Sequence, residues 1–517
     1  MDIDTLQSVG LVILEYGALL VAFIIIMLVV AIAWMYVVDV TQTSQTIRRN
    51  YPVLGRFRYF FEHLGEFFRQ YFFALDREEL PFNRAQRSWV YRAAKNIDST
   101  VAFGSTHPLN QPGDFIFLND FLVPLEEEVQ PRSNISFGEG YARHPYSTNA
   151  FFNISAMSFG ALSAPAISAL SRGAKKAGIW LNTGEGAISG YHLEGGCDIV
   201  FQIGTAKYGV RDEHGALSDT KLRTLAEIEQ VRMFEIKLSQ GAKPGKGGIL
   251  PGEKVTDVIA TTRGIPVGED SLSPNRHTDI NCMSDLLDMI HRVREVTGKP
   301  VGIKAVIGQT QWLEDLCLHI HERGLDYAPD FFTVDSADGG TGAAPQSLID
   351  YMGLPVNQSL PIVVDTLVRY QLKERIRVIS SGKMVNPAGV AAALCLGADC
   401  VNSARGFMFA LGCIQALQCN KNTCPTGITT HNEELQRGLD PTDKATRVAS
   451  YAHNLMHEVE VISHSCGCKE PGQLNRGHAQ VISETGFPKP LTALHPYAQP
   501  LAQFDPPKAL DEAIKVV

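Results

Sequence analysis

Short β-rich runs alternate with helical stretches between residues 151 and 403, and this alternation constrains the fold more than any other feature of the chain. The runs are 151–156, 179–182, 199–203, 233–238, 301–306, 331–335, 377–380 and 400–403. Strands that alternate with helices form parallel βα units. Eight units over roughly 250 residues predict an α/β protein with a (β/α)8 TIM barrel. A doubly wound open sheet is the alternative, but no GxGxxG turn follows an early strand.

The segments that follow the predicted strands are rich in glycine and polar residues. They read MSFGALS (157–163), NTGEG (182–186), KLSQGAKPGKGG (237–248), DSADGGTG (335–342) and SSGK (380–383). Glycine lets backbone amides approach a ligand closely, and barrel active sites are built on the loops at the C-terminal strand ends. We therefore expect one ligand site there, with Ser158, Gly339 and Gly340 among its cofactor contacts.

Two further segments predict a phosphate site. Barrels often hold phosphate on the loops after strands seven and eight, where SSGK and SARG (403–406) stand. The expected contacts are Ser381, Gly382, Lys383, Ala404, Arg405 and Gly406. Ordinary turns with a surface lysine and arginine are the alternative. FMN is favoured over a sugar phosphate because redox-capable thiols lie nearby in the sequence.

Lys237 and Lys304 fall at the ends of apolar predicted strands, where their ammonium groups should point into the barrel mouth. A buried lysine is costly unless it meets an anion. Reduced flavin would supply negative charge for both lysines. An internal carboxylate such as Glu185 or Asp335 is the other possible partner.

Three cysteines, Cys413, Cys419 and Cys424, lie close together directly after the last predicted strand. Five of the ten cysteines fall between Cys395 and Cys424, unlike the evenly spaced cysteines of a disulfide-stapled domain. Reduced thiols or metal ligands are therefore expected. An iron–sulfur cluster is favoured, and a Cys3His zinc site with His431 is the alternative.

Residues 18–38 are apolar and uncharged, and about 20 such residues suffice for a transmembrane helix. A signal peptide is the alternative, but acidic residues precede the segment where a positive region is expected. The arginines that follow are Arg48, Arg49, Arg56 and Arg58. By the positive-inside rule we expect a single-pass protein of the cell membrane with its catalytic domain in the cytoplasm.

The chain is expected to divide into a membrane anchor (1–40), a juxtamembrane and helical N-terminal extension (41–150), the barrel with its cysteine loop (151–440), and a C-terminal helical segment with an extended tail (441–517). The aromatic stretch 51–73 lies either on the membrane surface or against the barrel. Cys466 and Cys468 are interpreted as packing residues. A net charge of −9 argues against nucleic-acid binding.

Several motifs together resemble the FMN-binding synthase domain of glutamate synthase. They are ISAMSFGALS (154–163), NTGEG (182–186), IKLSQGAKPGKGGILPG (236–252), SPNRHTDI (273–280), DSADGGTGAAP (335–345) and the cysteine triplet ending in CPTGI (424–428). The segment DREELPFNRAQRSWVYR (76–92) is similar to shorter, single-domain FMN-binding glutamate synthase family proteins.

The resemblance implies reduction of 2-iminoglutarate, formed from 2-oxoglutarate and ammonia, to L-glutamate by hydride from FMN. It also implies that Cys413, Cys419 and Cys424 hold a [3Fe-4S] cluster. Lys243 and Arg263 would bind the substrate carboxylates, and Lys237 would contact the flavin. Glu185 and Gln240 would line the ammonia route and the reacting centre, with Lys243 beside them.

The chain also departs from the large glutamate synthases. Ile249 stands where the family usually has a glutamine, so another amine or oxo acid is an alternative substrate. We expect no glutamine hydrolysis on this chain, so ammonia would be free or come from a separate amidotransferase. Electrons are expected from ferredoxin or another donor protein. A membrane-tethered electron-transfer subunit without catalysis is the alternative from a different class.

Overall fold

The computed structural model describes residues 3–68 and 72–501. The chain divides into two compact units, residues 1–85 and residues 86–517.

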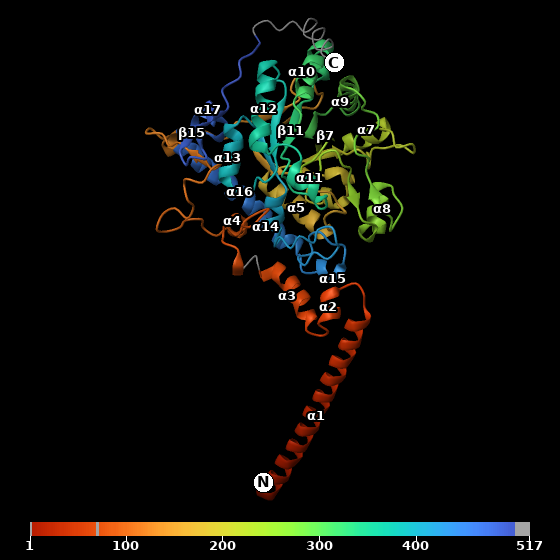
Figure 1. Ribbon diagram of the computed structural model, residues 1–517. Coiled ribbons are helices and arrows are strands. Elements are labelled where there is room, and N and C mark those ends of the chain that lie inside the picture. Colours follow the sequence, from red (N-terminus) through yellow and green to blue (C-terminus); the bar gives the residue numbers. More distant parts are fainter. Residues whose placement is uncertain (1–2, 69–71, 502–517) are drawn as a thin grey trace. The chain divides into compact units, whose positions relative to one another are not determined.

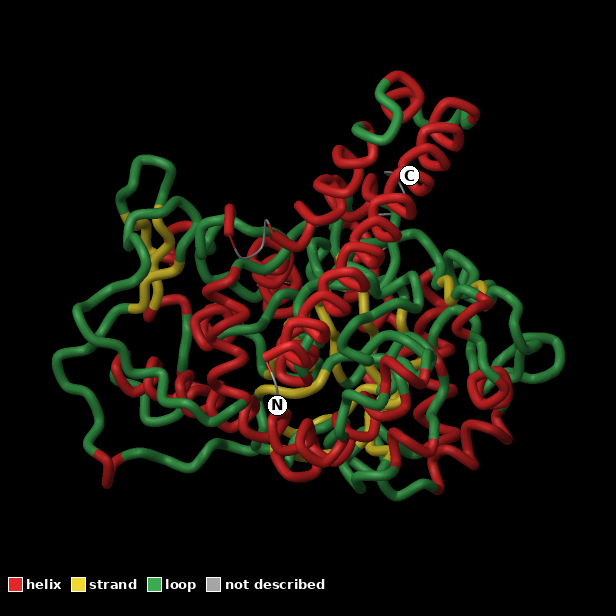
Figure 2. Tube along the Cα trace, turned by 90° about the horizontal axis from the view of Figure 1, so that it is seen from below, coloured by secondary structure: helices red, strands yellow, loops and turns green. Residues whose placement is uncertain are grey.

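The larger unit is built around a closed barrel of eight parallel strands (Figures 1 and 2). The strands are β4 (Phe152–Ile154), β5 (Leu181–Asn182), β6 (Ile199–Ile203), β7 (Val231–Lys237), β10 (Val301–Val306), β11 (Phe331–Asp335), β12 (Arg377–Ser381) and β13 (Cys400–Ser403). They follow one another in chain order around the barrel, which closes where β13 pairs with β4. The predicted barrel is therefore confirmed, and the open sheet is wrong.

Helices cover the outside of the barrel. They are α5 (Ala164–Ala177), α7 (Asp219–Glu227), α9 (Met283–Thr297), α10 (Gln311–Arg323), α12 (Val356–Arg369), α13 (Pro387–Cys395) and α14 (Arg405–Leu411), with the long α16 (Pro441–Ser465) packed on α5, α13 and α14. Gly173 of α5 permits this packing, because a Cβ atom there would lie 2.5 Å from Cβ of Val448. Further helices are α4 (Arg84–Ala94), α6 (Gly190–Leu193), α11 (Gln346–Tyr351) and α15 (Glu433–Gln436).

A hairpin of β2 (Ile135–Phe137) and β3 (Tyr146–Thr148) packs at the N-terminal strand ends. Phe137 is fully buried, with its ring centroid 5.8 Å from those of both Trp180 and Phe331. The same cluster also contains four residues near the beginnings of β6, β7, β12 and β13: Val200, Met233, Ile379 and Cys400. The barrel interior is thus closed by side chains at this end, which leaves the opposite end for a ligand.

The C-terminal segment beyond α16 is more ordered than the expected extended tail. Strand β14 (Ala479–Ile482) pairs with both β1 (Phe115–Phe117) and β15 (Pro488–Pro490) in an antiparallel sheet, and α17 (Leu491–Leu494) follows. Strand β15 is at the edge of this sheet, where proline is tolerated because its missing N–H can face away from the neighbouring strand, and this accounts for the difference from the prediction. Residues 502–517 of the predicted tail lie outside the described chain.

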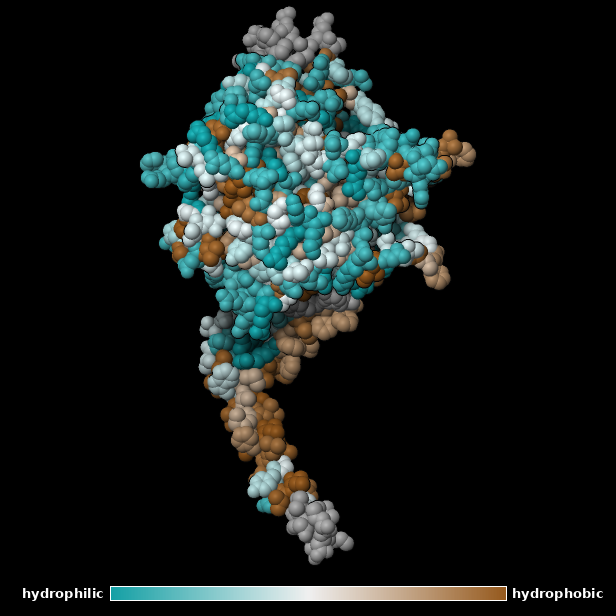
Figure 3. Space-filling model, turned by 180° about the vertical axis from the view of Figure 1, so that it is seen from behind, coloured by the Kyte–Doolittle hydropathy of each residue, from teal (hydrophilic) through white to brown (hydrophobic). Residues whose placement is uncertain are grey.

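The smaller unit contains α1 (Ile3–Thr41), α2 (Thr46–Asn50) and α3 (Gly55–Phe68). Residues 10–41 of α1 are long and apolar enough to cross a membrane, and their apolar side chains are exposed (Figure 3). Helix α1 includes the predicted segment 18–38. Helix α3 lies within the aromatic stretch 51–73. Residues 69–71 of that stretch lie outside the described chain.

Candidate active site

A cavity of about 190 Å³ lies at the C-terminal ends of the barrel strands, where the glycine-rich loops were expected to meet. The predicted residues that line it are Ser158, Glu185, Lys237, Gln240, Lys243, Arg263, Lys304, Gly340, Ser381, Gly382, Lys383, Ala404, Arg405 and Cys419. Gly339, Gly406, Cys413 and Cys424 are not among the lining residues. Loops distant in sequence therefore form one site.

The cavity is strongly cationic although the whole chain carries a net charge of −9. Its lining includes seven lysine or arginine side chains and only two carboxylates, Glu185 and Asp335. Concentrated positive charge in a low-dielectric cleft attracts anions. The cavity is therefore suited to a ligand with phosphate or carboxylate groups.

Glu185 and Lys237 form an ion pair in the wall of the cavity, with Oε2 and Nζ 2.8 Å apart. Lys237 also donates a hydrogen bond to Oε1 of Gln240, whose Nε2 donates to Oγ1 of Thr341 at 3.2 Å. Burial opposes ionisation of Glu185, but the Lys237 ammonium outweighs it and lowers the pKa of the carboxyl group. Glu185 is thus held as a carboxylate at the cavity wall.

Lys304 forms the second ion pair, with its Nζ 3.3 Å from Oδ2 of Asp335. Burial disfavours its charge, but Asp335 outweighs burial and raises the pKa of Lys304. The backbone N–H of Gly241 donates to the same Asp335 oxygen at 2.9 Å. Both strand-end lysines therefore have carboxylate partners, which was one of the two possibilities that the sequence left open.

The long connection between β7 and α9 supplies most of the other charged side chains that line the cavity. It contains the short hairpin of β8 (Ile249–Leu250) and β9 (Ser271–Leu272), with α8 (Asp257–Arg263) between its strands. Ile249 lies on this hairpin, lines the cavity and is 43 % exposed. A single segment thus sets both the charge and the apolar surface of this wall.

Lys243 and Arg263 are buried cations without a carboxylate partner in the described parts of the chain. The Lys243 ammonium makes no side-chain hydrogen bond or ion pair within residues 3–68 and 72–501, and burial lowers its pKa. Arg263 donates to Oγ of Ser271 at 3.2 Å and to the carbonyl oxygen of Phe159 at 3.1 Å. Buried charges are normally paired, so these two cations favour an anionic ligand.

Lys254 is a third buried cation of this wall, and the sequence reasoning missed it. Its Nζ donates to the carbonyl oxygens of Ala161 at 3.2 Å and Cys419 at 3.1 Å. Burial lowers the pKa of Lys254 to about 8. Its place two residues after the ILPG motif was the available signal, but the sequence position of a single lysine does not reveal its burial.

The proposed phosphate loops lie together at the cavity. Nζ of Lys383 is 2.9 Å from Oδ2 of Asp338, and Arg405 donates to the carbonyl oxygen of Thr341. Gly382 has a φ of 108°, and a Cβ atom there would lie 2.4 Å from Cβ of Ser336. The small residues and cations of these loops fit a phosphate-bearing cofactor such as FMN.

The cysteine loop follows α14 and joins the cavity through Cys419. Burial raises the pKa of the Cys413 thiol to about 11, with smaller contributions from the other two sulfurs. Burial also opposes ionisation of Cys424, but hydrogen bonds, first that of the Thr426 hydroxyl at 3.4 Å, lower its pKa. Burial therefore disfavours the thiolate form of Cys413, whereas hydrogen bonds favour the thiolate form of Cys424.

The side chains of this loop are not gathered around one point. Within residues 3–68 and 72–501 no three His, Cys, Asp or Glu side chains are arranged to hold a metal ion. Nε2 of His431, the fourth ligand of the zinc alternative, lies 2.8 Å from the carbonyl oxygen of Gly160. Cys466 and Cys468 are buried, as their interpretation as packing residues requires.

Residues 124–469 match the family model described as the conserved region in glutamate synthase. The chain belongs to this glutamate synthase family. The match extends from before the barrel to beyond α16, and it includes every site residue named above. The family resemblance seen in the motifs is therefore confirmed, and the chain is a glutamate synthase-like barrel of the oxidoreductase class.

Relatives from two bacteria agree with this assignment. The glutamate synthase large subunit-like protein YerD of Bacillus subtilis is 36 % identical over 90 % of this chain and 96 % of its own length. An archaeal-type glutamate synthase [NADPH] of Thermotoga maritima is 34 % identical over 64 % of this chain, and the aligned part is 62 % of that protein. This glutamate synthase family member thus spans less than two thirds of the archaeal-type relative.

Among solved structures, mandelate oxidase with benzoyl-formic acid matches with a TM-score of 0.44 and 14 % identity, over 77 % of this chain and 98 % of that one. This is a loose superposition. The barrel architecture of the glutamate synthase family member rests on its own strand pairing.

Proposed function

We propose that the protein is a flavin oxidoreductase that converts 2-oxoglutarate and ammonia, through 2-iminoglutarate, into L-glutamate. The observation that carries the proposal is the pair of buried cations, Lys243 and Arg263, which share one cavity and have no carboxylate partner within the described residues. A dicarboxylate would supply one carboxylate for each cation. Charge-assisted hydrogen bonds of this kind are stronger than hydrogen bonds between neutral groups.

FMN would supply the hydride, as a bound flavin does in this class of enzyme. The phosphate would be held by Ser381, Gly382 and Lys383 of one loop and Ala404, Arg405 and Gly406 of the other. The other proposed contacts of FMN are Ser158, Gly339, Gly340, Lys237 and Lys304. The two lysines are held by Glu185 and Asp335 and so present fixed positive charge to the flavin site.

The chain's own groups have distinct proposed tasks. Lys243 and Arg263 orient the substrate by its carboxylates, and Gln240 helps to position Lys237 through their hydrogen bond. Glu185 is proposed to hold and move the proton at the imine nitrogen, a task suited to a carboxylate beside the reacting atom. A Cβ atom at Gly248 would lie 2.6 Å from Oε1 of Glu185, so glycine there leaves room for this carboxylate.

Cys413, Cys419 and Cys424 are proposed as the ligands of a [3Fe-4S] cluster. The cluster would supply electrons one at a time to the flavin, and ferredoxin or another protein would be the donor. The support is the grouping of three thiols on one loop that reaches the cavity through Cys419.

Membrane anchoring is a separate part of the proposal. Helix α1 is proposed as a single span of the cell membrane, with the barrel in the cytoplasm. Its support is length, composition and the exposure of its apolar side chains. The division into anchor (1–40), extension (41–150), barrel (151–440) and C-terminal segment (441–517) is kept as part of this proposal.

Anaerobic purification followed by activity measurement tests the catalytic proposal. The purified protein should show flavin absorbance and the electron-spin signal of a three-iron cluster. It should form glutamate from 2-oxoglutarate and ammonia when reduced ferredoxin is supplied. Bound flavin without turnover would refute the substrate assignment and favour the electron-transfer subunit. Zinc without iron or sulfide would refute the cluster.

Ile249 motivates a second candidate, a flavin oxidoreductase that acts on another amine or oxo acid. Its exposed aliphatic side chain lines the cavity and offers no hydrogen bond to a distal carboxylate. Binding of 2-oxoglutarate should be compared with that of oxo acids with apolar side chains. If I249Q strengthens binding of 2-oxoglutarate and weakens binding of the apolar acids, the natural substrate belongs to the second class.

A further inference from the structure

Helix α3 exposes a continuous aromatic face. Phe57, Phe60, Phe61 and Phe68 are 57 %, 58 %, 61 % and 38 % exposed. With the half-buried Leu64 they follow the spacing i, i+3, i+4, i+7, i+11, which places them on one side of the helix. Soluble proteins rarely expose large contiguous apolar patches, so this face is expected to have an occupant.

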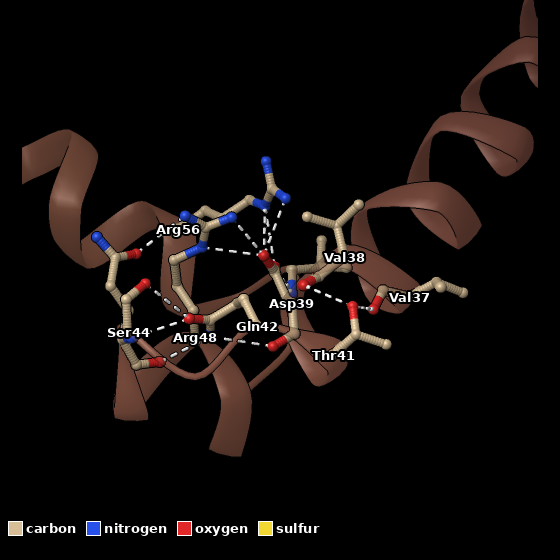
Figure 4. Close-up of polar contacts among 10 residues, drawn as sticks. Val37, Val38, Asp39, Thr41, Gln42, Ser44, Arg48 and Arg56 are labelled. Atoms are coloured by element: carbon tan, nitrogen blue, oxygen red, sulfur yellow. Dashed lines mark hydrogen bonds and ion pairs between the residues drawn. The ribbon is translucent and has the colours of Figure 1, made fainter.

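The start of α3 is fixed to the end of α1 by a buried carboxylate (Figure 4). Asp39 is fully buried, with Oδ1 2.6 Å from Nη2 of Arg48 and 2.9 Å from Nη2 of Arg56. The backbone N–H of Val53 donates to Oδ2 of Asp39 at 2.9 Å. Two guanidinium groups and an amide satisfy this carboxylate, so α3 is held to α1 by a folded connection.

Gly55 shows how closely the chain is packed at this connection. A Cβ atom at Gly55 would lie 2.8 Å from the carbonyl oxygen of Ile47 and 2.9 Å from Cα of Arg48. Any larger residue would force α2 and α3 apart. Sequence reasoning assigned Arg48 and Arg56 only to the positive charge that follows the apolar segment, and the structure adds their binding to Asp39.

We propose that α3 is an interfacial helix whose aromatic face lies in the headgroup region of the phospholipid bilayer that α1 enters. This inference rests on the proposed membrane span. Hydrogen bonds from Arg48 and Arg56 to Asp39 hold the start of α3 next to the end of the apolar helix α1. Aromatic side chains favour the membrane–water interface, and amphipathic helices bury their apolar face there.

The charges beside the aromatic face complement an anionic membrane surface. Arg49 and Arg58 are exposed. On the polar side of α3, Nη1 of Arg58 lies 3.1 Å from Oε2 of Glu62. Each basic residue close to an anionic leaflet contributes to attraction. The barrel unit and a second copy of the chain are the other candidates to cover the aromatic face. Neither explains why α3 is held to the end of a helix that is long and apolar enough to cross a membrane.

The proposal can be tested on the full chain in vesicles of phosphatidylcholine with a minor fraction of phosphatidylglycerol. A lipid-soluble diazirine is photolysed in the bilayer, and the modified residues are mapped by mass spectrometry. We expect modification of α1 and of Phe57, Phe60 and Phe61, with at least several-fold less at Arg58 and Glu62. F57S/F61S should reduce modification of α3 several-fold and leave α1 unchanged, whereas E62S on the polar side should change neither.

Each other outcome overturns the inference in a distinguishable way. Modification of α1 without α3 would refute the interfacial helix and leave the membrane span intact. Modification of neither helix would refute both. Chemical cross-links from α3 to the barrel unit, or between two chains, together with an unmodified aromatic face, would identify the actual occupant. Unchanged helical content by circular dichroism, together with an unchanged thermal transition of the barrel, confirms that the variants are folded.

Discussion

Nζ of Lys237, at the end of β7, lies 2.8 Å from Oε2 of Glu185, which follows β5. The pair joins the end of β7 to the loop after β5, across 52 residues of sequence, and favours ionisation of the one carboxylate proposed to act at the imine nitrogen. Because Glu185 is held as a carboxylate, the pH dependence of stability should report on this contact.

Replacing Glu185 with glutamine should destabilise the protein at neutral pH by roughly 3 kcal/mol, because Lys237 becomes a buried charge without its carboxylate. The folded-state pKa of Glu185 is lowered, so its contribution is present above the unfolded pKa of about 4.3 and is lost as pH falls below it. The difference in the free energy of unfolding between wild type and E185Q should therefore shrink in acid. E253Q, at an exposed carboxylate, should show no such pH dependence.

Replacing Lys243 with methionine should weaken binding of 2-oxoglutarate about 10- to 100-fold, because a charge-assisted hydrogen bond is worth about 1.5–3 kcal/mol. Flavin content should be unchanged, since Lys243 is proposed to contact substrate only. Calorimetric titration of the oxidised protein with 2-oxoglutarate measures the affinity. K246M, three residues away at an exposed lysine, is the control. Equal affinity in wild type and K243M would remove Lys243 from the substrate site.

Replacing Lys254 with methionine should loosen the cysteine loop, because its Nζ ties the carbonyl of Cys419 to that of Ala161. Anaerobically purified K254M should lose iron to a chelator faster than wild type does, by several-fold. K421M removes an exposed lysine from the same loop and should behave as wild type. If both variants lose iron at the wild-type rate, the two hydrogen bonds do not stabilise the ligand loop.

Serine at Cys413, Cys419 or Cys424 should abolish iron and sulfide binding while flavin remains bound. A three-iron cluster that loses one of three thiolates has no spare ligand of the same kind on this loop. Metal analysis and flavin absorbance are measured on the same samples. C282S, at an exposed cysteine, should keep a full complement of iron. Retention of iron in any one of the loop variants would exclude that residue as a ligand.

Replacing Phe137 with alanine should cost about 3–5 kcal/mol of unfolding free energy, because it leaves a cavity among Trp180, Phe331 and Tyr146. This cluster lies at the barrel end opposite the cationic cavity, so flavin affinity below the melting transition should be unaffected. Denaturant unfolding and flavin titration measure the two effects. F121A, at a residue that is 93 % exposed, should change neither.

The local pattern of apolar runs and turn residues was sufficient to predict the order of the barrel elements and the place of the ligand loops. Strands β6, β10, β11 and β13 begin and end at the predicted residues, because buried parallel strands are uninterrupted apolar runs bounded by turn residues. Fourteen predicted site residues line one cavity because the loops after parallel strands meet at one end of a barrel. These features depend on local pattern and on the closure of the sheet.

The pairing of the charges, in contrast, could be read only from the folded chain. Lys237 and Lys304 meet Glu185 and Asp335, whereas Lys243 has no partner in residues 3–68 and 72–501, although all of these lysines are close to strand ends. Lys254 enters the site for the same reason, since its burial depends on two loops brought together by folding. Ion pairing depends on distances between side chains of different strands and on exclusion of water, and neither is encoded in the spacing of residues along the chain.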